Sequence, residues 1–161
     1  MRNVDNPPLV AANTLRLVYL VSSLIVLQLY MKDLGASPFQ VSLLTVVFWT
    51  AMLVFAPLWG AVSDASGRRK ALMAASVLGA AVIIPFYAYM DTISGVLSLR
   101  FLYSVLVVGF PPIALASMSL HTSGESRGED LAPYHTSRAV GFLIGWGGAV
   151  IRNLLRIVDA L

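Results

Sequence analysis

The sequence predicts an all-α integral membrane protein, a bundle of transmembrane helices. Of its 161 residues 58% are hydrophobic and only 12% are charged, and the mean hydropathy is +0.80. Soluble domains carry about 25% charged residues. Several uncharged runs approach about 20 residues, the length that an α-helix needs to cross the hydrocarbon core of a bilayer. No alternation of polar and apolar residues typical of strands interrupts these runs.

The first predicted span covers residues 11–30. It is the least apolar of the four clear spans because it contains Arg16 near one end, where a long side chain can reach the interface. A cleaved signal peptide with Leu17 to Leu27 as its apolar core is the alternative for this run. Asp5 in the preceding segment and the spans that follow at once argue against that alternative.

Three further spans follow, over residues 39–59, 71–90 and 101–120. The second and third contain no charged residue. The fourth follows Arg100 and contains Pro111 and Pro112, which remove backbone donors and are expected to kink or loosen the helix. Short connections with turn residues such as Gly35 and Pro38 predict antiparallel hairpins.

A fifth, partial span is predicted over residues 139–155. Its uncharged part, Ala139 to Ile151, is short, and Arg152 and Arg156 follow. The polar stretch 121–138 before it is predicted to be a cytoplasmic loop.

The basic residues predict the orientation, because cytoplasmic connections carry an excess of Lys and Arg. With the N-terminus in the cytoplasm, the inner side holds seven basic residues and the early outer side holds Lys32 and Arg100. The seven are Arg2, Arg16, Arg68, Arg69, Lys70, Arg127 and Arg138. Because the basic residues lie mainly between the apolar runs and not on one face, they indicate topology and not nucleic-acid binding.

The stretch between the second and third spans, GAVSDASGRRKALM from Gly60 to Met73, is the most informative. Three adjacent cations are explained by topology alone. Asp64 is not, because acidic residues contribute little to topology. It lies between Gly60 and Gly67, where backbones can approach closely.

This stretch resembles the loop between the second and third helices of the major facilitator superfamily of secondary transporters, approximately G-x-x-x-D-x-x-G-R-[RK]-[RK]. The matching residues are Gly60, Asp64, Gly67, Arg68, Arg69 and Lys70. Ala65 and Ser66 depart from the basic and bulky residues that the family often has there, which weakens any assignment to a subfamily. Arg100 resembles the arginine of a second family motif, R-x-x-Q-G, although Tyr103 and Ser104 replace its Gln and Gly.

The resemblance implies transport of a small solute by alternating access, with substrate held between two six-helix halves. Asp64 would then act as a latch, accepting bonds from Arg68 and from the N-terminus of a helix in the second half. On this reading the chain is a partial N-terminal half, inactive without the missing C-terminal half. A drug/proton antiporter-like or a sugar-type member is expected, in the plasma membrane.

Polar residues within spans are costly and therefore indicate function. Gln28, Arg100 and Tyr103 are the candidate substrate or coupling residues, since the resemblance implies that the first and fourth helices line the cavity. Interhelical hydrogen bonding by Gln28 and interfacial placement of the other two explain them equally well.

The glycines of the last span permit close helix packing, with Gly141 and Gly145 in G-x-x-x-G spacing and Gly148 nearby. In a transporter this face would meet a helix of the same chain. In the alternative reading it would join copies of a small multispan scaffold or pore. Neither reading is an enzyme, and we expect no catalytic residue, cofactor or metal.

Overall fold

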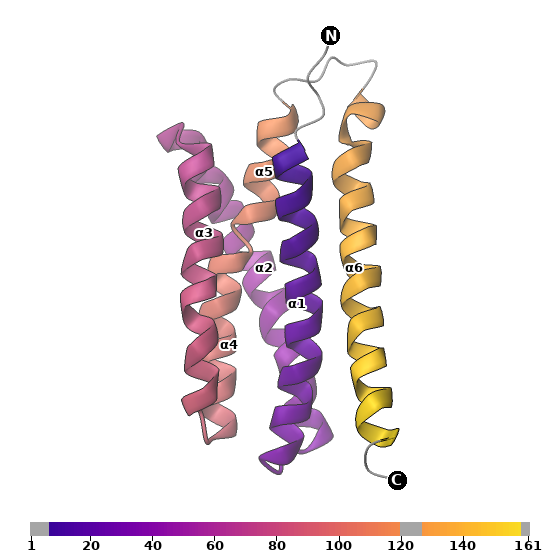
Figure 1. Cartoon of the computed structure of the whole chain (residues 1–161). Coiled ribbons are helices and arrows are strands. Elements are labelled where there is room, and N and C mark those ends of the chain that lie inside the picture. The colour runs from indigo at the N-terminus through magenta and orange to yellow at the C-terminus, as the bar shows by residue number, and fades with distance from the viewer. Residues whose placement is uncertain (1–6, 120–126, 159–161) are drawn as a thin grey trace. The chain divides into compact units, whose positions relative to one another are not determined.

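The computed structural model describes residues 7–119 and 127–158, and every regular element within them is helical (Figure 1). Its contacts divide the chain into two compact units: Met1–Leu27 with His121–Leu161, and Gln28–Leu120. The helices are α1 Pro7–Asp33, α2 Pro38–Ser66, α3 Arg69–Ile83, the 3-10 helix η1 Ile84–Tyr89, α4 Ile93–Val107, α5 Phe110–Ser119 and α6 Arg127–Val158.

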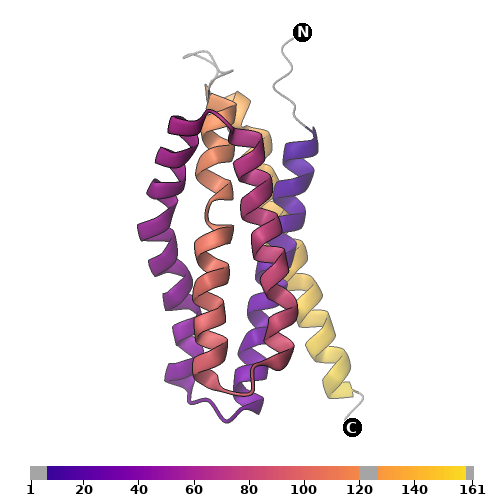
Figure 2. The same cartoon turned by 90° about the vertical axis from the view of Figure 1, so that its left-hand side faces the viewer.

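Local signals set the helix ends in the second unit. Gly35 adopts a positive φ of 80° between α1 and α2, a conformation that favours glycine. Ser37 caps α2 by accepting a bond from the Gln40 backbone N–H, while the Gln40 side chain accepts one from the Ser37 N–H. Thr92 caps α4 in the same way through the Gly95 N–H. Helices α2, α3 and α4 follow one another in alternating directions (Figure 2).

The fourth span is two helices and not one continuous helix from residue 101 to 120. Helix α4 already begins at Ile93 and ends at Val107, and α5 begins at Phe110. The interruption at residues 108–109 is visible in Figure 2 as a short non-helical link. It lies one residue before Pro111 and Pro112, which agrees with the loss of helical donors expected there.

In the first unit α1 and α6 run side by side in the same direction (Figure 1). Near the start of both helices the Asn13 amide donates a hydrogen bond to the Ser137 hydroxyl at 2.7 Å. More than two turns later the Ser22 hydroxyl donates to the Gly145 carbonyl at 3.4 Å. Parallel directions are those expected of a first and a fifth span.

The prediction of a loop over residues 121–138 is wrong from residue 127 onward, because α6 begins at Arg127. Residues 121–126 lie outside the described residues. The helix also continues through Pro133. Low hydropathy made this stretch resemble a loop, but hydropathy reports affinity for lipid and not helicity. Buried packing of Tyr134 and Ser137 within the unit stabilises the helix instead.

Four stretches of the described residues are long and apolar enough to cross a membrane: Pro7–Asp33, Pro38–Ser66, Arg69–Tyr89 and Ile93–Met118. This confirms the predicted helix bundle with four clear spans. Only 17% of the most apolar window of α2 is buried. Large apolar side chains such as Phe39 and Leu53 are exposed instead, which is the surface expected of a helix that faces lipid.

Candidate functional site

The turn between α2 and α3 carries the acidic and basic residues of the sequence motif. Gly67 ends α2 in the left-handed conformation with φ 64°, and its N–H donates to the Ser63 carbonyl at 3.1 Å. Arg68 is the N-cap of α3, and its backbone N–H donates to the Ser66 hydroxyl at 3.4 Å. The glycine at position 67 is therefore required by its backbone conformation.

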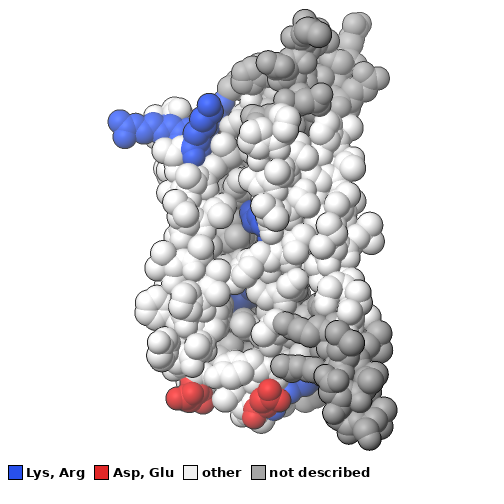
Figure 3. All heavy atoms as spheres, viewed as in Figure 1, with Lys and Arg blue, Asp and Glu red and all other residues white. Residues whose placement is uncertain are grey.

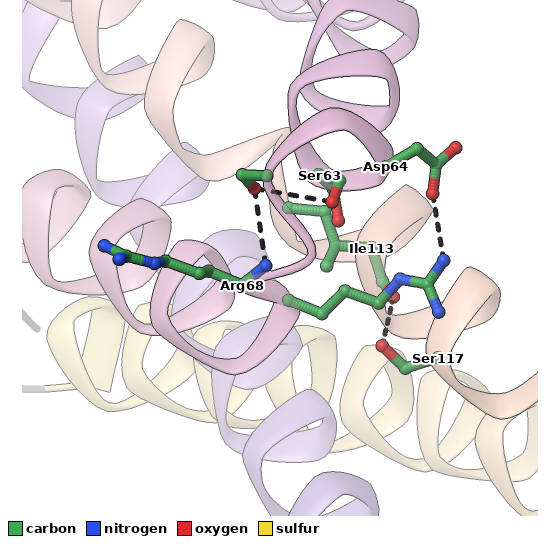
Figure 4. A network of polar contacts seen from close by, with 7 residues as sticks. Ser63, Asp64, Arg68, Ile113 and Ser117 are labelled. Atoms are coloured by element: carbon green, nitrogen blue, oxygen red, sulfur yellow. Dashed lines mark hydrogen bonds and ion pairs between the residues drawn. The ribbon is translucent and has the colours of Figure 1, made fainter.

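Asp64 is paired with Arg69 and not with Arg68, which corrects the predicted partner. Arg69 Nη2 donates to Asp64 Oδ1 at 3.0 Å, and Figure 4 shows Arg68 extending away from Asp64. Arg68 has the non-helical dihedrals of a cap whereas Arg69 is the first helical residue, so their side chains diverge. The Asp64 side chain stays 67% exposed and that of Arg69 is 24% exposed.

Gly60 has open space where a Cβ would lie, with no atom within 4 Å. The close backbone approach expected at this position is therefore not made by the described part of the chain. Gly60 also has no positive φ, so its conformation does not require glycine.

The exposed charges of the second unit gather at its two ends, with Asp64 beside the cations of the α2–α3 turn and Lys32 beside Asp33 at the other end. Arg68 and Lys70 are exposed where α3 begins, and Asp91 is exposed at the far end, before α4. Figure 3 shows protruding basic side chains at one end of this face, acidic side chains with a basic one beside them at the other end, and mostly uncharged surface between the two ends. Cations at a helix N-terminus oppose the helix dipole, so helix stability does not account for Arg69 and Lys70 there.

Arg100 lies inside the second unit, only 2% exposed. Its Nε donates to the Leu44 carbonyl of α2 at 3.4 Å. Its guanidinium carbon lies 5.3 Å from the centre of the Phe48 ring and 5.5 Å from that of the Tyr103 ring. The arrangement joins two of the three candidate residues, Arg100 and Tyr103, in one buried cation–π cluster.

Gln28, the third candidate, is half-buried on α1 and makes no hydrogen bond among the described residues. The structure therefore does not connect it with Arg100 and Tyr103.

The glycines of α6 divide into two kinds. A Cβ at Gly141 would lie 2.8 Å from Leu17 Cβ, and one at Gly145 would lie 2.9 Å from Val21 Cβ, so both glycines allow α1 to approach closely. Gly148 has open space around it. Because α1 covers the face of Gly141 and Gly145, a second copy of the chain would have to displace it.

Residues 12–151 match the model of the Major Facilitator Superfamily. The chain belongs to this superfamily. As a major facilitator chain with four apolar spans, it is a multi-pass membrane protein.

Relatives within the superfamily match this chain over only part of their own length. The chain is 33% identical to the multidrug resistance protein MdtG of Proteus mirabilis over 124 residues, 74% of this chain and 30% of the relative. It is 34% identical over 100 residues to the MFS-type transporter YuxJ of Bacillus subtilis, 62% of this chain and 25% of the relative. The chain is 28% identical over 137 residues to the MFS-type transporter YybF of the same organism, which is 83% of this chain and 32% of the relative. The chain thus spans about a third or less of these relatives, and no solved structure matches it.

Two contacts of this superfamily chain were missed by sequence reasoning. Asn13 and Ser137, separated by 124 residues in sequence, form a buried polar link between α1 and α6. The Trp59 indole N–H donates to the Val105 carbonyl at 2.8 Å, next to Gly109. A glycine two residues before a pair of prolines indicates a weak point in a helix, but no pattern in the sequence indicates which side chain packs against it.

Proposed function

We propose that the chain supplies N-terminal spans of a secondary transporter that moves a small solute across the plasma membrane by alternating access. The observation that carries this proposal is the α2–α3 turn, in which Asp64 pairs with Arg69 at the start of α3. The turn matches the superfamily loop at every motif position, and the superfamily match covers most of the chain. The relatives' names describe transporters.

Asp64 is suited to a contact that forms and breaks. Its carboxylate is mostly exposed, and only Oδ1 is bonded among the described residues, so Oδ2 can accept a further donor. The positive end of a helix in the C-terminal half is the partner that the superfamily resemblance implies. An exposed ion pair contributes about 0–1 kcal/mol, which is small enough to be broken in each transport cycle.

The substrate is proposed as a small organic solute, either drug-like or sugar-like. MdtG is named for multidrug resistance, which favours the drug/proton antiporter-like type. Arg100 and Tyr103 would act from their buried cluster and Gln28 from α1. We propose an N-terminus in the cytoplasm, which places the turn with Arg68, Arg69 and Lys70 on the cytoplasmic side.

The test is Asp64→Asn in the intact protein that contains these residues, produced in bacterial cells. Efflux of ethidium tests the drug-like type, and uptake of a radiolabelled disaccharide tests the sugar-like type. Losing a contact worth up to 1 kcal/mol should lower the transport rate roughly fivefold at equal membrane abundance. The control is Asp91→Asn, the same change at an exposed acid far from the turn.

Unchanged transport by Asp64→Asn would remove the latch from the proposal. If neither probe is transported and Asp64→Asn leaves self-assembly intact, the oligomeric scaffold or pore becomes the better reading. In that reading neither the charge nor the latch matters.

A further inference from the structure

The break between α4 and α5 leaves backbone carbonyls without their usual helical donors. Pro111 and Pro112 have no N–H, so the carbonyls four residues earlier, those of Val107 and Val108, receive no helical bond from them. The Gly109 N–H donates to the Leu106 carbonyl at 3.2 Å. It is thereby turned away from the Val105 carbonyl, which it would bond in a continuous helix.

Trp59 of α2 supplies the donor that the Val105 carbonyl lacks, through its indole N–H at 2.8 Å. Both residues belong to the second unit. The break falls inside the apolar stretch Ile93–Met118, where water is not at hand to satisfy a carbonyl. Leaving the Val105 carbonyl without a donor there would cost free energy, so the bond from Trp59 stabilises the broken helix.

Gly109 makes the contact sterically possible. A Cβ at position 109 would lie 2.6 Å from Cδ2 of the Trp59 ring and 2.9 Å from two further ring atoms. Carbon atoms of real side chains do not approach a rigid ring so closely, and an indole ring has no flexible end that can yield. Any side chain at position 109 would therefore move Trp59 away from Val105.

We propose that Trp59 and Gly109 form a pinned hinge in the fourth span. The two prolines and Gly109 open the helix, and the Trp59 indole fixes the resulting bend by bonding to the Val105 carbonyl. Without the indole N–H, α5 would sample several orientations relative to α4. The proposal concerns the helix pair itself and does not depend on whether the chain transports a solute.

The test measures how widely α5 moves relative to α4. Because the chain has no cysteine, Leu102→Cys on α4 and Leu115→Cys on α5 provide two unique sites for spin labels. Pulsed electron paramagnetic resonance then gives the distance distribution between them for the chain in lipid nanodiscs. Trp59→Phe keeps an aromatic ring but removes the donor, and should widen the distribution roughly twofold by adding a second population.

The matched control is Trp49→Phe, the same change on the same helix at a side chain that is 60% exposed. It should leave the distribution unchanged. Gly109→Ala should widen it as Trp59→Phe does, because the added Cβ displaces the ring. Equal distributions for Trp59→Phe and Trp49→Phe would overturn the proposal.

A second background separates the hinge from general loss of packing. Pro111→Ala with Pro112→Ala restores backbone donors and lets the helix continue through residue 109, so Gly109 N–H can bond to Val105. In that background Trp59→Phe should have no effect. An equal widening with and without the prolines would show that the ring acts through packing alone and would overturn the hinge.

If Trp59→Phe prevents folding, spectroscopy on a folded variant decides the question. Trp49→Phe with Trp146→Phe leaves Trp59 as the single tryptophan, since the chain has three. Its ultraviolet resonance Raman spectrum should show the band of a hydrogen-bonded indole N–H. The band position of a free indole would overturn the proposal.

Discussion

Asn13 illustrates how a polar side chain can be accommodated inside an apolar helix pair. It is fully buried, and its amide donates to the Ser137 hydroxyl at 2.7 Å while accepting a bond from Arg16 at 3.3 Å. The Ser137 hydroxyl in turn donates to the Tyr134 carbonyl at 2.6 Å. Because each group has a partner, the link stabilises the contact of α1 with α6 at small cost.

We predict that Asn13→Ala lowers the free energy of unfolding by about 1 kcal/mol, the usual scale of a hydrogen bond between membrane helices. The measurement is unfolding by sodium dodecyl sulfate in mixed micelles. Ser23→Ala is the control, because the Ser23 hydroxyl bonds within α1 only, to the Leu20 carbonyl. Equal losses for both variants would contradict a special role of the interhelical link.

The pairing of Asp64 shows the limit of a motif at residue scale. The spacing places two arginines near the carboxylate, and one position along the chain decides which of them reaches it. Asp64 pairs with Arg69 because of the backbone conformation at Gly67 and Arg68. That conformation is visible in the structure and not in the sequence.

At the scale of elements, small residues of α6 set its distance from α1. Gly141 and Gly145 lie opposite Leu17 and Val21, so α1 side chains occupy the room that a Cβ would need. The sequence predicted a close-packing face here but left its partner open between another helix of the same chain and another copy of the chain. The structure places α1 on Gly141 and Gly145, and it leaves Gly148 outside the contact.

We predict that Gly145→Leu weakens the contact of α1 with α6, because the new side chain overlaps Val21. Overpacking of this kind costs on the order of 1–3 kcal/mol. Gly148→Leu makes the same change three residues away in open space and should be close to neutral. Thermal unfolding in detergent, followed by circular dichroism, compares the two. A loss of stability in Gly148→Leu equal to that in Gly145→Leu would contradict the assignment of the packed face.

The first three predicted spans fall on helical, apolar stretches of the structure, namely α1, α2, and α3 followed by η1, because hydropathy and helix formation coincide there. The prediction was wrong at residues 127–138, where a polar stretch is helical through contacts with α1. The fourth span was predicted as one loosened helix, and the effect of Pro111 and Pro112 appears just before them, at residues 108–109. A proline removes a bond to a carbonyl four residues earlier, so the helix opens upstream of the proline itself.

At the scale of the whole molecule, charge at the ends of the spans determines orientation. Basic side chains lie at the α2–α3 turn, and Asp91 lies at the far end of α3 and η1 in the same unit. The inner face of a membrane retains Lys and Arg, which favours the α2–α3 turn on the cytoplasmic side.

We predict that Asp91→Cys reacts with a membrane-impermeant maleimide in intact cells, whereas Ala65→Cys reacts only after the cells are permeabilised. Both positions are exposed, so access to the reagent and not burial decides the result. The cysteine-free chain provides its own background control. Labelling of Ala65→Cys in intact cells would reverse the proposed orientation.

The sequence by itself determined the membrane class, the four clear spans and the family resemblance, because length, hydropathy and motif spacing are local properties of the chain. Only the tertiary structure decided that Asp64 meets Arg69, that α1 covers the glycines of α6, and that Trp59 bonds to Val105. These contacts join residues from different turns or helices, up to 124 positions apart, as Asn13 and Ser137 are. They depend on helix rotation and crossing, which the packing of the whole unit fixes.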